Sequence, residues 1–218
     1  MSSTLCYQSI PVTPYQQNCS VVWCDESKQA AVIDPGGEVE RLYSFITSQN
    51  LTLSAVWLTH GHLDHVGGAS KLAQLVGVPI IGPAKGDAFW LEALSEQAKM
   101  MGFGDAKAFT PDRWLSHGDV LPLGKLCFEV IHCPGHTPGH IVLFERGARR
   151  AFVGDVLFQN SIGRSDFPQG NHEQLVHSIR ERLFPLGDDV NFVPGHGPES
   201  TFGQERQTNP FVSDSRYG

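Results

Sequence analysis

Long apolar runs are missing from this 218-residue sequence. No stretch approaches the ~20 apolar residues that a membrane-spanning helix needs. The first residues lack the basic region and apolar core of a secretory leader. The five cysteines are odd in number and form no closely paired motif, which argues against a disulfide framework and fits reduced thiols. These absences predict a soluble, cytoplasmic protein with no membrane partner.

Positive charge is also scarce. Lys and Arg number 16 against 23 Asp and Glu, which gives a formal net charge of -7, and no dense basic run occurs. A nucleic-acid-binding surface needs clustered basic charge, so we expect no nucleic-acid partner. The hydrophobic content of 40% is ordinary for a globular chain, and no linker divides the sequence. We therefore predict a single domain over residues 1–218.

Histidine, in contrast, is concentrated in one short motif, LTHGHLDH, at residues 58–65. The apolar segment 54–58 predicts a buried strand, and the spaced apolar residues over 66–76 predict a helix, so the motif falls in a strand-to-helix loop. A loop can direct several side chains to one point. Imidazole and carboxylate ligands suit zinc, iron or manganese. The motif therefore predicts a metal site that contains His60, His62, Asp64 and His65.

Three later apolar segments are each followed by a turn or loop that carries a His or an Asp. The residues in question are His136, Asp155 and His196. One loop supplies too few ligands for a metal site, so these residues are candidates to complete it. The roles of His132, Cys133 and His140 stay open at this stage. Either histidine could orient a ligand or pack structurally, and the cysteine could be reactive or a buried thiol.

The full pattern, HxHxDH followed by a single His, a single Asp and a final His, resembles the metallo-β-lactamase superfamily across essentially the whole chain. Within that superfamily it is most similar to glyoxalase II-like hydrolases, through residues 59–65, 134–139, 163–168 and 194–198. The resemblance implies two divalent metal ions, most readily zinc, with iron or manganese as alternatives. The implied ligands are His60, His62 and His136 for one ion, Asp64, His65 and His196 for the other, and Asp155 bridging both.

The resemblance also implies a function. A hydroxide held by the metals would attack a thioester carbonyl, as in a hydroxyacylglutathione hydrolase that converts S-lactoylglutathione to D-lactate and glutathione. Asp64 is the implied catalytic residue, which binds metal and orients the hydroxide. Arg164 is implied to bind a carboxylate of the glutathione moiety, with a structural ion pair to Asp166 as the alternative. The expected partner is a small-molecule, glutathione-derived thioester.

The chain departs from the longer glyoxalase II pattern at several places. Asp166 and Pro198 stand where that form has aromatic residues, and the sequence ends soon after Phe211, which predicts a short form without the C-terminal helical domain. Two other enzymes stay open: a persulfide dioxygenase with a single iron, and a lactonase. The Gly-His-Gly-Pro context of His196 favours the hydrolases. A non-catalytic metal-binding platform is disfavoured, because every implied ligand is present.

Hydrophobic periodicity predicts alternating strands and helices. The expected strands lie near 9–12, 19–23, 30–33, 54–58, 78–81, 120–123, 126–131, 141–144, 150–153 and 190–193. The expected helices span about 38–48, 66–76, 87–101, 172–184 and 201–207. This pattern by itself predicts a mixed α/β class. The family resemblance implies the αββα four-layer sandwich of the metallo-β-lactamase fold.

Overall fold

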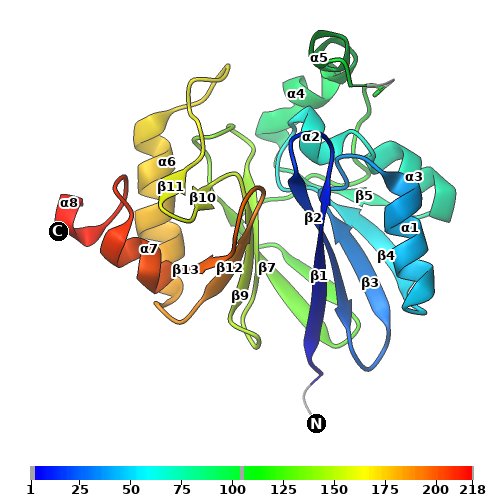
Figure 1. The fold of residues 1–218 in the computed structure, drawn as a ribbon, viewed down its shortest axis with the longest axis horizontal. Coiled ribbons are helices and arrows are strands. Elements are labelled where there is room, and N and C mark those ends of the chain that lie inside the picture. Colours follow the sequence, from blue (N-terminus) through cyan, green and yellow to red (C-terminus); the bar gives the residue numbers. More distant parts are fainter. Residues whose placement is uncertain (1–2, 104–105, 218) are drawn as a thin grey trace.

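Two β-sheets face each other in the computed structural model, which describes residues 3–103 and 106–217. Helices cover the outer face of each sheet, so that the layers follow the order helix, sheet, sheet, helix (Figure 1). The predicted αββα arrangement is confirmed. In the described part of the chain, no helix combines the length and the apolar character needed to cross a membrane.

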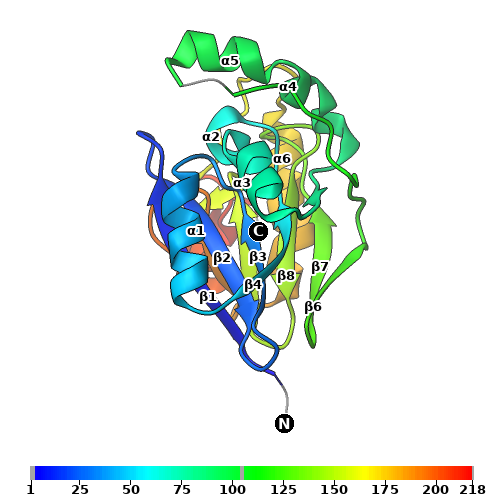
Figure 2. The same ribbon diagram turned by 90° about the vertical axis from the view of Figure 1, so that its right-hand side faces the viewer.

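The first sheet comes from the N-terminal half. Its strands, in spatial order, are β1(Leu5–Val12), β2(Gln17–Cys24), β3(Gln29–Ile33), β4(Thr52–Trp57) and β5(Ile80–Ile81). β3, β4 and β5 pair in parallel. Helices α1(Val39–Ser48) and α3(Ala69–Val76) lie over this sheet, and both stand in front of it in Figure 2. α1 is held there because Val39, Leu42 and Ile46 form one buried stripe at helical spacing.

The second sheet comes from the C-terminal half. Its strands, in spatial order, are β13(Ser200–Thr201), β12(Asn191–Pro194), β9(Arg150–Gly154), β8(Ile141–Glu145), β7(Leu126–His132) and β6(Val120–Leu123). Its helices are α6(His172–Ser178), extended by η2(Ile179–Leu183) and η3(Phe184–Leu186), then α7(Phe202–Thr208) and α8(Asp214–Tyr217). The two sheets share a buried core in which the rings of Trp57 and Phe128 lie 5.0 Å apart.

Strand direction places the predicted ligand loops at one edge of the sandwich. β4 runs parallel to β3, and β12 runs parallel to β9. The segments that follow β4, β9 and β12, together with the loop between β7 and β8, therefore meet at the upper edge in Figure 1. Each sheet contributes ligand-bearing loops to the same place.

The predicted helix over 66–76 differs from the structure. It begins earlier, as α2(Leu63–Val66), and is interrupted before α3. The backbone N–H of Gly68 donates to Pro35 O (2.8 Å). A Cβ at Gly67 or Gly68 would come within 2.7 Å of backbone oxygens of residues 35 and 36. The close approach of residues 35 and 36 ends α2 at this point. α2 carries the second half of the histidine motif.

Two further elements depart from the prediction. The helix expected over 87–101 is divided into η1(Lys85–Asp87), α4(Ala88–Glu92) and α5(Leu94–Met101). The chain after Asp155 forms a small hairpin, β10(Leu157–Phe158) and β11(Ser161–Ile162), which the sequence did not predict. Strands of two residues are too short to show a period of alternation.

Candidate metal centre

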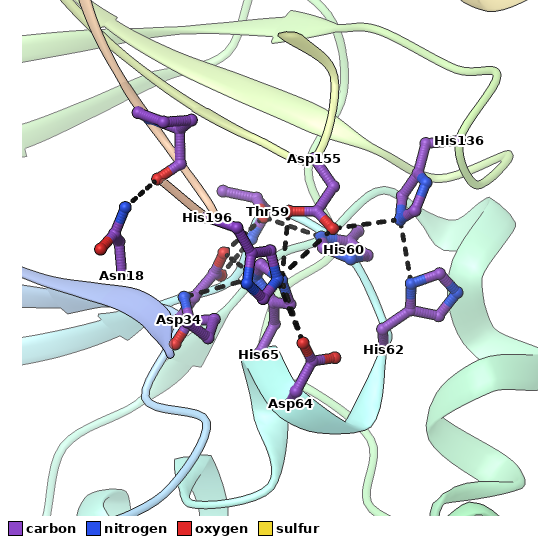
Figure 3. A network of polar contacts seen from close by, with 12 residues as sticks. Asn18, Asp34, Thr59, His60, His62, Asp64, His65, His136, Asp155 and His196 are labelled. Carbon is purple, nitrogen blue, oxygen red and sulfur yellow. Dashed lines mark hydrogen bonds and ion pairs between the residues drawn. The ribbon is translucent and has the colours of Figure 1, made fainter. Parts of the chain in front are cut away.

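Three histidines converge beside the carboxyl end of β4 (Figure 3). His60 and His62 follow β4, and His136 lies in the loop between β7 and β8. Nδ1 of His62 lies 3.0 Å from Nε2 of His136, and one nitrogen from each of the three rings lies within 4.8 Å of the other two. We call these residues the first cluster. It unites the three side chains that the sequence predicts as ligands of one metal.

Asp64, His65 and His196 form the second cluster. Asp64 and His65 lie on α2, whereas His196 follows β12 in the other half of the chain. Oδ2 of Asp64 lies 3.2 Å from Nε2 of His196 and 3.8 Å from Nε2 of His65. The structure thus also brings together the three residues predicted as ligands of the other metal.

Asp155 lies between the two clusters, directly after β9 (Figure 3). Its Oδ1 is 3.3 Å from Nε2 of His65, and its Oδ2 is 3.7 Å from Nε2 of His136 and of His196. Burial would raise the pKa of the Asp155 carboxyl, but the neighbouring rings, His65 first, hold that pKa below its ordinary value. An ionised carboxylate between the clusters can face a cation on either side and offset the repulsion between two cations.

Hydrogen bonds orient the rings of His65, His136 and His196 so that Nε2 faces the clusters. The Nδ1 donors and their acceptors are His65 to Asp34 Oδ2 (2.8 Å), His136 to Arg164 O (2.7 Å) and His196 to Tyr15 O (3.1 Å). In a neutral imidazole, donation from Nδ1 leaves Nε2 with its lone pair free. Partners of this kind fix the tautomer and direction of metal-binding imidazoles.

Asp34 is a supporting residue that belongs to none of the motifs found in the sequence. Its buried carboxylate accepts hydrogen bonds from Thr59 N (2.7 Å), Thr59 Oγ1 (2.5 Å) and His65 Nδ1. Since the Thr59 hydroxyl donates to Asp34, its oxygen accepts from Nδ1 of His60 at 3.0 Å. One carboxylate therefore orients a ring in each cluster. Its position directly after the apolar strand β3 matches that of Asp155 after β9 and would have indicated it.

The chemistry of this centre fits bound metal. Nε2 of His60, Nε2 of His65 and Oδ1 of Asp155 are buried and have no hydrogen-bond partner within residues 3–103 and 106–217. Each unpaired atom of this kind costs about 1–3 kcal/mol, a cost that a cation would remove. Burial lowers the pKa of His60 and lowers that of His62 to about 3, so both rings are neutral at pH 7. Neutral imidazole is the metal-binding form.

The three residues left open around His136 have distinct surroundings. His140 stacks on His60, with ring centroids 4.6 Å apart, and its Nε2 accepts a hydrogen bond from the backbone N–H of Asp155 (3.1 Å). His132 donates from Nε2 to Pro138 O (2.8 Å) and supports the loop. Cys133 is fully buried, and burial raises its pKa to about 12. It is therefore an unreactive thiol in the core.

A cleft of about 640 Å³ opens onto the two clusters. Five of the candidate ligands reach it: His62, Asp64, His136, Asp155 and His196. Its walls include Tyr15 from the β1–β2 turn, Met101 from α5 and Phe158 from the β10–β11 hairpin. The sequence analysis missed these three residues, because they come from separate segments and belong to no motif.

Arg164 also lines the cleft and is engaged by Asp166. Its Nε and one terminal nitrogen lie 3.0 and 2.8 Å from the two carboxylate oxygens of Asp166. The guanidinium lies over the ring of Phe167, 4.6 Å from the ring centroid. Phe167 in turn packs against the rings of His62 and His136. The ion pair with Asp166, left open as an alternative by the sequence, is present.

Comparison with known proteins agrees with the fold and the motifs. A family model described as the metallo-beta-lactamase superfamily matches residues 12–196. Hydroxyacylglutathione hydrolase GloC of Haemophilus influenzae is 53% identical over 205 residues, which cover 94% of this chain and 96% of that protein.

Two solved structures are similar over nearly their whole length. The BLEG-1 B3 metallo-beta-lactamase has a TM-score of 0.88 at 35% identity, with coverage of 95% of this chain and 99% of that chain. TTHA1623, solved in a di-iron-bound form, has a TM-score of 0.85 at 34% identity, with coverage of 94% and 100%.

Proposed function

The chain belongs to the metallo-β-lactamase superfamily, and from that premise we propose that it is a thioester hydrolase with a pair of metal ions. The observation that carries the proposal is the position of Asp155, within 3.3–3.7 Å of rings from both clusters. The first cluster would hold one ion, the second cluster would hold the other, and Asp155 would contact both. Zinc is the proposed metal, and the same donors suit iron or manganese.

The metals and the chain have separate tasks. When bound, two such metals lower the pKa of a shared water toward neutrality and polarise the substrate carbonyl. We assign Asp64 the catalytic task of accepting a hydrogen bond from the attacking oxygen, because its carboxylate reaches the cleft. Burial would raise the pKa of Asp64, but the neighbouring His65 ring lowers it overall, so the acceptor is ionised. A thiol has a pKa of about 8.5, so the leaving thiolate needs little protonation.

The proposed substrate is a hydroxyacylglutathione, with S-lactoylglutathione as the example, cleaved to D-lactate and glutathione. Support comes from the 53% identity to a protein named hydroxyacylglutathione hydrolase over nearly the full length of both chains. The cleft volume of about 640 Å³ falls in the range of small-molecule sites. Both sheets supply ligands to each cluster, which supports one domain over residues 1–218.

The direct test is an assay of purified protein whose metal content has been measured. We expect S-lactoylglutathione hydrolysis, followed by release of free thiol, and loss of that activity on treatment with a chelator. Two other substrates are assayed in parallel: oxygen uptake is recorded with glutathione persulfide, and ring opening is recorded with a simple lactone. Oxygen uptake without thioester cleavage would instead identify a persulfide dioxygenase, and lactone opening alone would identify a lactonase.

Arg164 is the proposed anchor for a substrate carboxylate, and Asp166 competes with that carboxylate for the same guanidinium. Both side chains are exposed. We expect Arg164→Ala to raise KM for S-lactoylglutathione with metal content unchanged. We expect Asp166→Asn to lower KM roughly two- to fivefold, because solvent screening keeps the competing ion pair weak. The measurement is a set of steady-state rates for wild type and both variants.

A matched control separates this effect from a general loss of surface charge. Arg146, which directly follows β8, forms the same forked pair with Glu129, and neither residue lines the cleft. Arg146→Ala should leave KM unchanged. A second control is a thioester whose glutathione carboxylates are converted to amides. Wild type and Asp166→Asn should have the same KM for this substrate. Loss of metal in Arg164→Ala would show that the residue is structural instead.

A further inference from the structure

Asp87 is a buried carboxylate outside the two clusters that joins the loops of the first cluster. It lies at the end of η1, just before α4, and is fully shielded from solvent. Oδ2 accepts hydrogen bonds from the backbone N–H of Gly61 (2.8 Å) and from the hydroxyl of Thr137 (2.8 Å). Oδ1 accepts from the backbone N–H of Gly139 (2.5 Å). All three donors belong to ligand-bearing loops.

The positions of these donors give Asp87 its significance. Gly61 is the residue between His60 and His62, and Thr137 directly follows His136. The carboxylate therefore ties the peptide between two ligands of the first cluster to the residue beside the third. These loops leave different sheets, and Asp87 belongs to neither loop. One side chain from a third segment thus sets the spacing between them.

Glycine is required at two of these positions because Asp87 and its helix approach so closely. A Cβ at Gly61 would lie 2.7 Å from Cβ of Trp90 and 3.3 Å from Cβ of Asp87. A Cβ at Gly139 would lie 2.4 Å from the backbone nitrogen of Asp87 and 2.7 Å from its Oδ1. The glycines within the histidine motifs therefore make room for this contact.

We propose that Asp87 is a positioning residue for the first metal site, which holds the His60–His62 loop and the His136 loop at the separation that one metal ion requires. The inference rests on the proposed function only in taking the first cluster to bind metal. Two nitrogens on one tetrahedral zinc lie ~3.3 Å apart, given Zn–N distances of ~2.0–2.1 Å. The 3.0 Å between Nδ1 of His62 and Nε2 of His136 is close to that spacing.

The second cluster has its own support, so the effect of Asp87 is selective. Asp34 orients His65, and the Tyr15 carbonyl orients His196. Neither contact involves Asp87. Loss of Asp87 should therefore weaken metal binding at the first cluster and leave the second cluster nearly unaffected. A general destabilisation of the fold would weaken both alike.

Asparagine is the informative substitution because it keeps the size of Asp87 and removes one acceptor. Whichever way the amide is turned, its NH₂ faces a backbone N–H, of Gly61 or of Gly139, and that donor loses its partner. Burial raises the pKa of the native carboxyl to about 6, so at pH 7.5 the wild type presents both oxygens as acceptors.

The experiment titrates metal-free wild type and Asp87→Asn with cobalt(II) and with zinc at pH 7.5, against a chromophoric chelator. We expect one of two equivalents to bind roughly 10- to 100-fold more weakly in the variant, the usual effect of losing an outer partner of a ligand. The affinity for the other equivalent should be nearly unchanged. The cobalt(II) spectrum reports which donor set has altered, without reference to turnover.

The matched control is Glu205→Gln. Glu205 is also fully buried and accepts hydrogen bonds from Asn160 N, Ser200 Oγ and Asn209 Nδ2 (2.5–2.9 Å), none of them in a ligand loop. The Glu205→Gln variant should be less stable than wild type and should keep the affinities for both metal equivalents. If Asp87→Asn does not fold, Thr137→Val decides, since it removes one donor at nearly constant volume. Weaker binding of only one metal equivalent by Thr137→Val would support the proposal.

Unchanged affinities in Asp87→Asn, or an equal loss at both equivalents, would overturn the proposal. Failure of the proposed function looks different. Wild type that binds one equivalent and cleaves no thioester would refute the dinuclear hydrolase. The comparison of that single affinity between wild type and Asp87→Asn would still decide the role of Asp87.

Discussion

Replacement of Asp155 by alanine is expected to abolish thioester hydrolysis and to release metal from the protein. Asp155 is the carboxylate that lies within reach of rings from both clusters. Without it, the two cations would repel each other with no anion between them. We expect a loss in kcat/KM of roughly a thousandfold or more, because metal ions contribute several kcal/mol of transition-state stabilisation and each ~1.4 kcal/mol is a factor of ten. Thiol release and metal analysis on the same sample measure both effects.

Two companion variants define what this result means. Asp155→Asn keeps the size of the side chain and removes its charge, and it should also lose activity and metal. Cys133→Ser changes a buried thiol that forms no side-chain hydrogen bond to a candidate ligand within residues 3–103 and 106–217, so it should keep metal and activity. Equal activity in Asp155→Ala and Cys133→Ser would contradict the assignment.

Replacement of Asp34 by alanine is expected to lower the free energy of unfolding by about 3–5 kcal/mol, because each buried donor left without an acceptor costs about 1–3 kcal/mol. The substitution leaves three buried donors without an acceptor, two from Thr59 and one from His65. Urea unfolding of the metal-free proteins measures this loss separately from any loss of metal. Asp34→Asn, which keeps one acceptor, should fall between wild type and alanine.

A surface carboxylate provides the comparison for Asp34. Glu129 is paired with Arg146 at the surface, and exposed pairs of this kind contribute at most about 1 kcal/mol. Glu129→Ala should therefore change the free energy of unfolding by no more than that. Similar small losses for Asp34→Ala and Glu129→Ala would show that Asp34 does not anchor the histidine motif.

The location of the site could be predicted because its residues follow a simple rule of chain geometry. His60, Asp155 and His196 each follow an apolar strand, and parallel neighbours in a sheet deliver such residues to one edge. The structure brings all seven candidate ligands together, while their binding of metal stays a prediction. The superfamily and the αββα fold, both expected from the motifs, are confirmed.

The supporting residues could not be predicted in the same way. Asp87 precedes a short helix and belongs to no motif, and its importance comes from contacts with Gly61 and Gly139, which are distant in sequence. The break between α2 and α3 has the same origin, since it depends on the approach of residues 35 and 36. Local patterns describe which residues can carry chemistry. Long-range contacts decide how those residues are held.

The measurement that most directly tests the metal-pair hydrolase is a zinc titration of metal-free protein with S-lactoylglutathione present. Free thiol release is recorded after each addition, and bound zinc is determined on the same samples. We predict that the rate rises to a plateau at two equivalents per chain, with little activity at one. A plateau at one equivalent, or no thiol release at two, would contradict the proposed function.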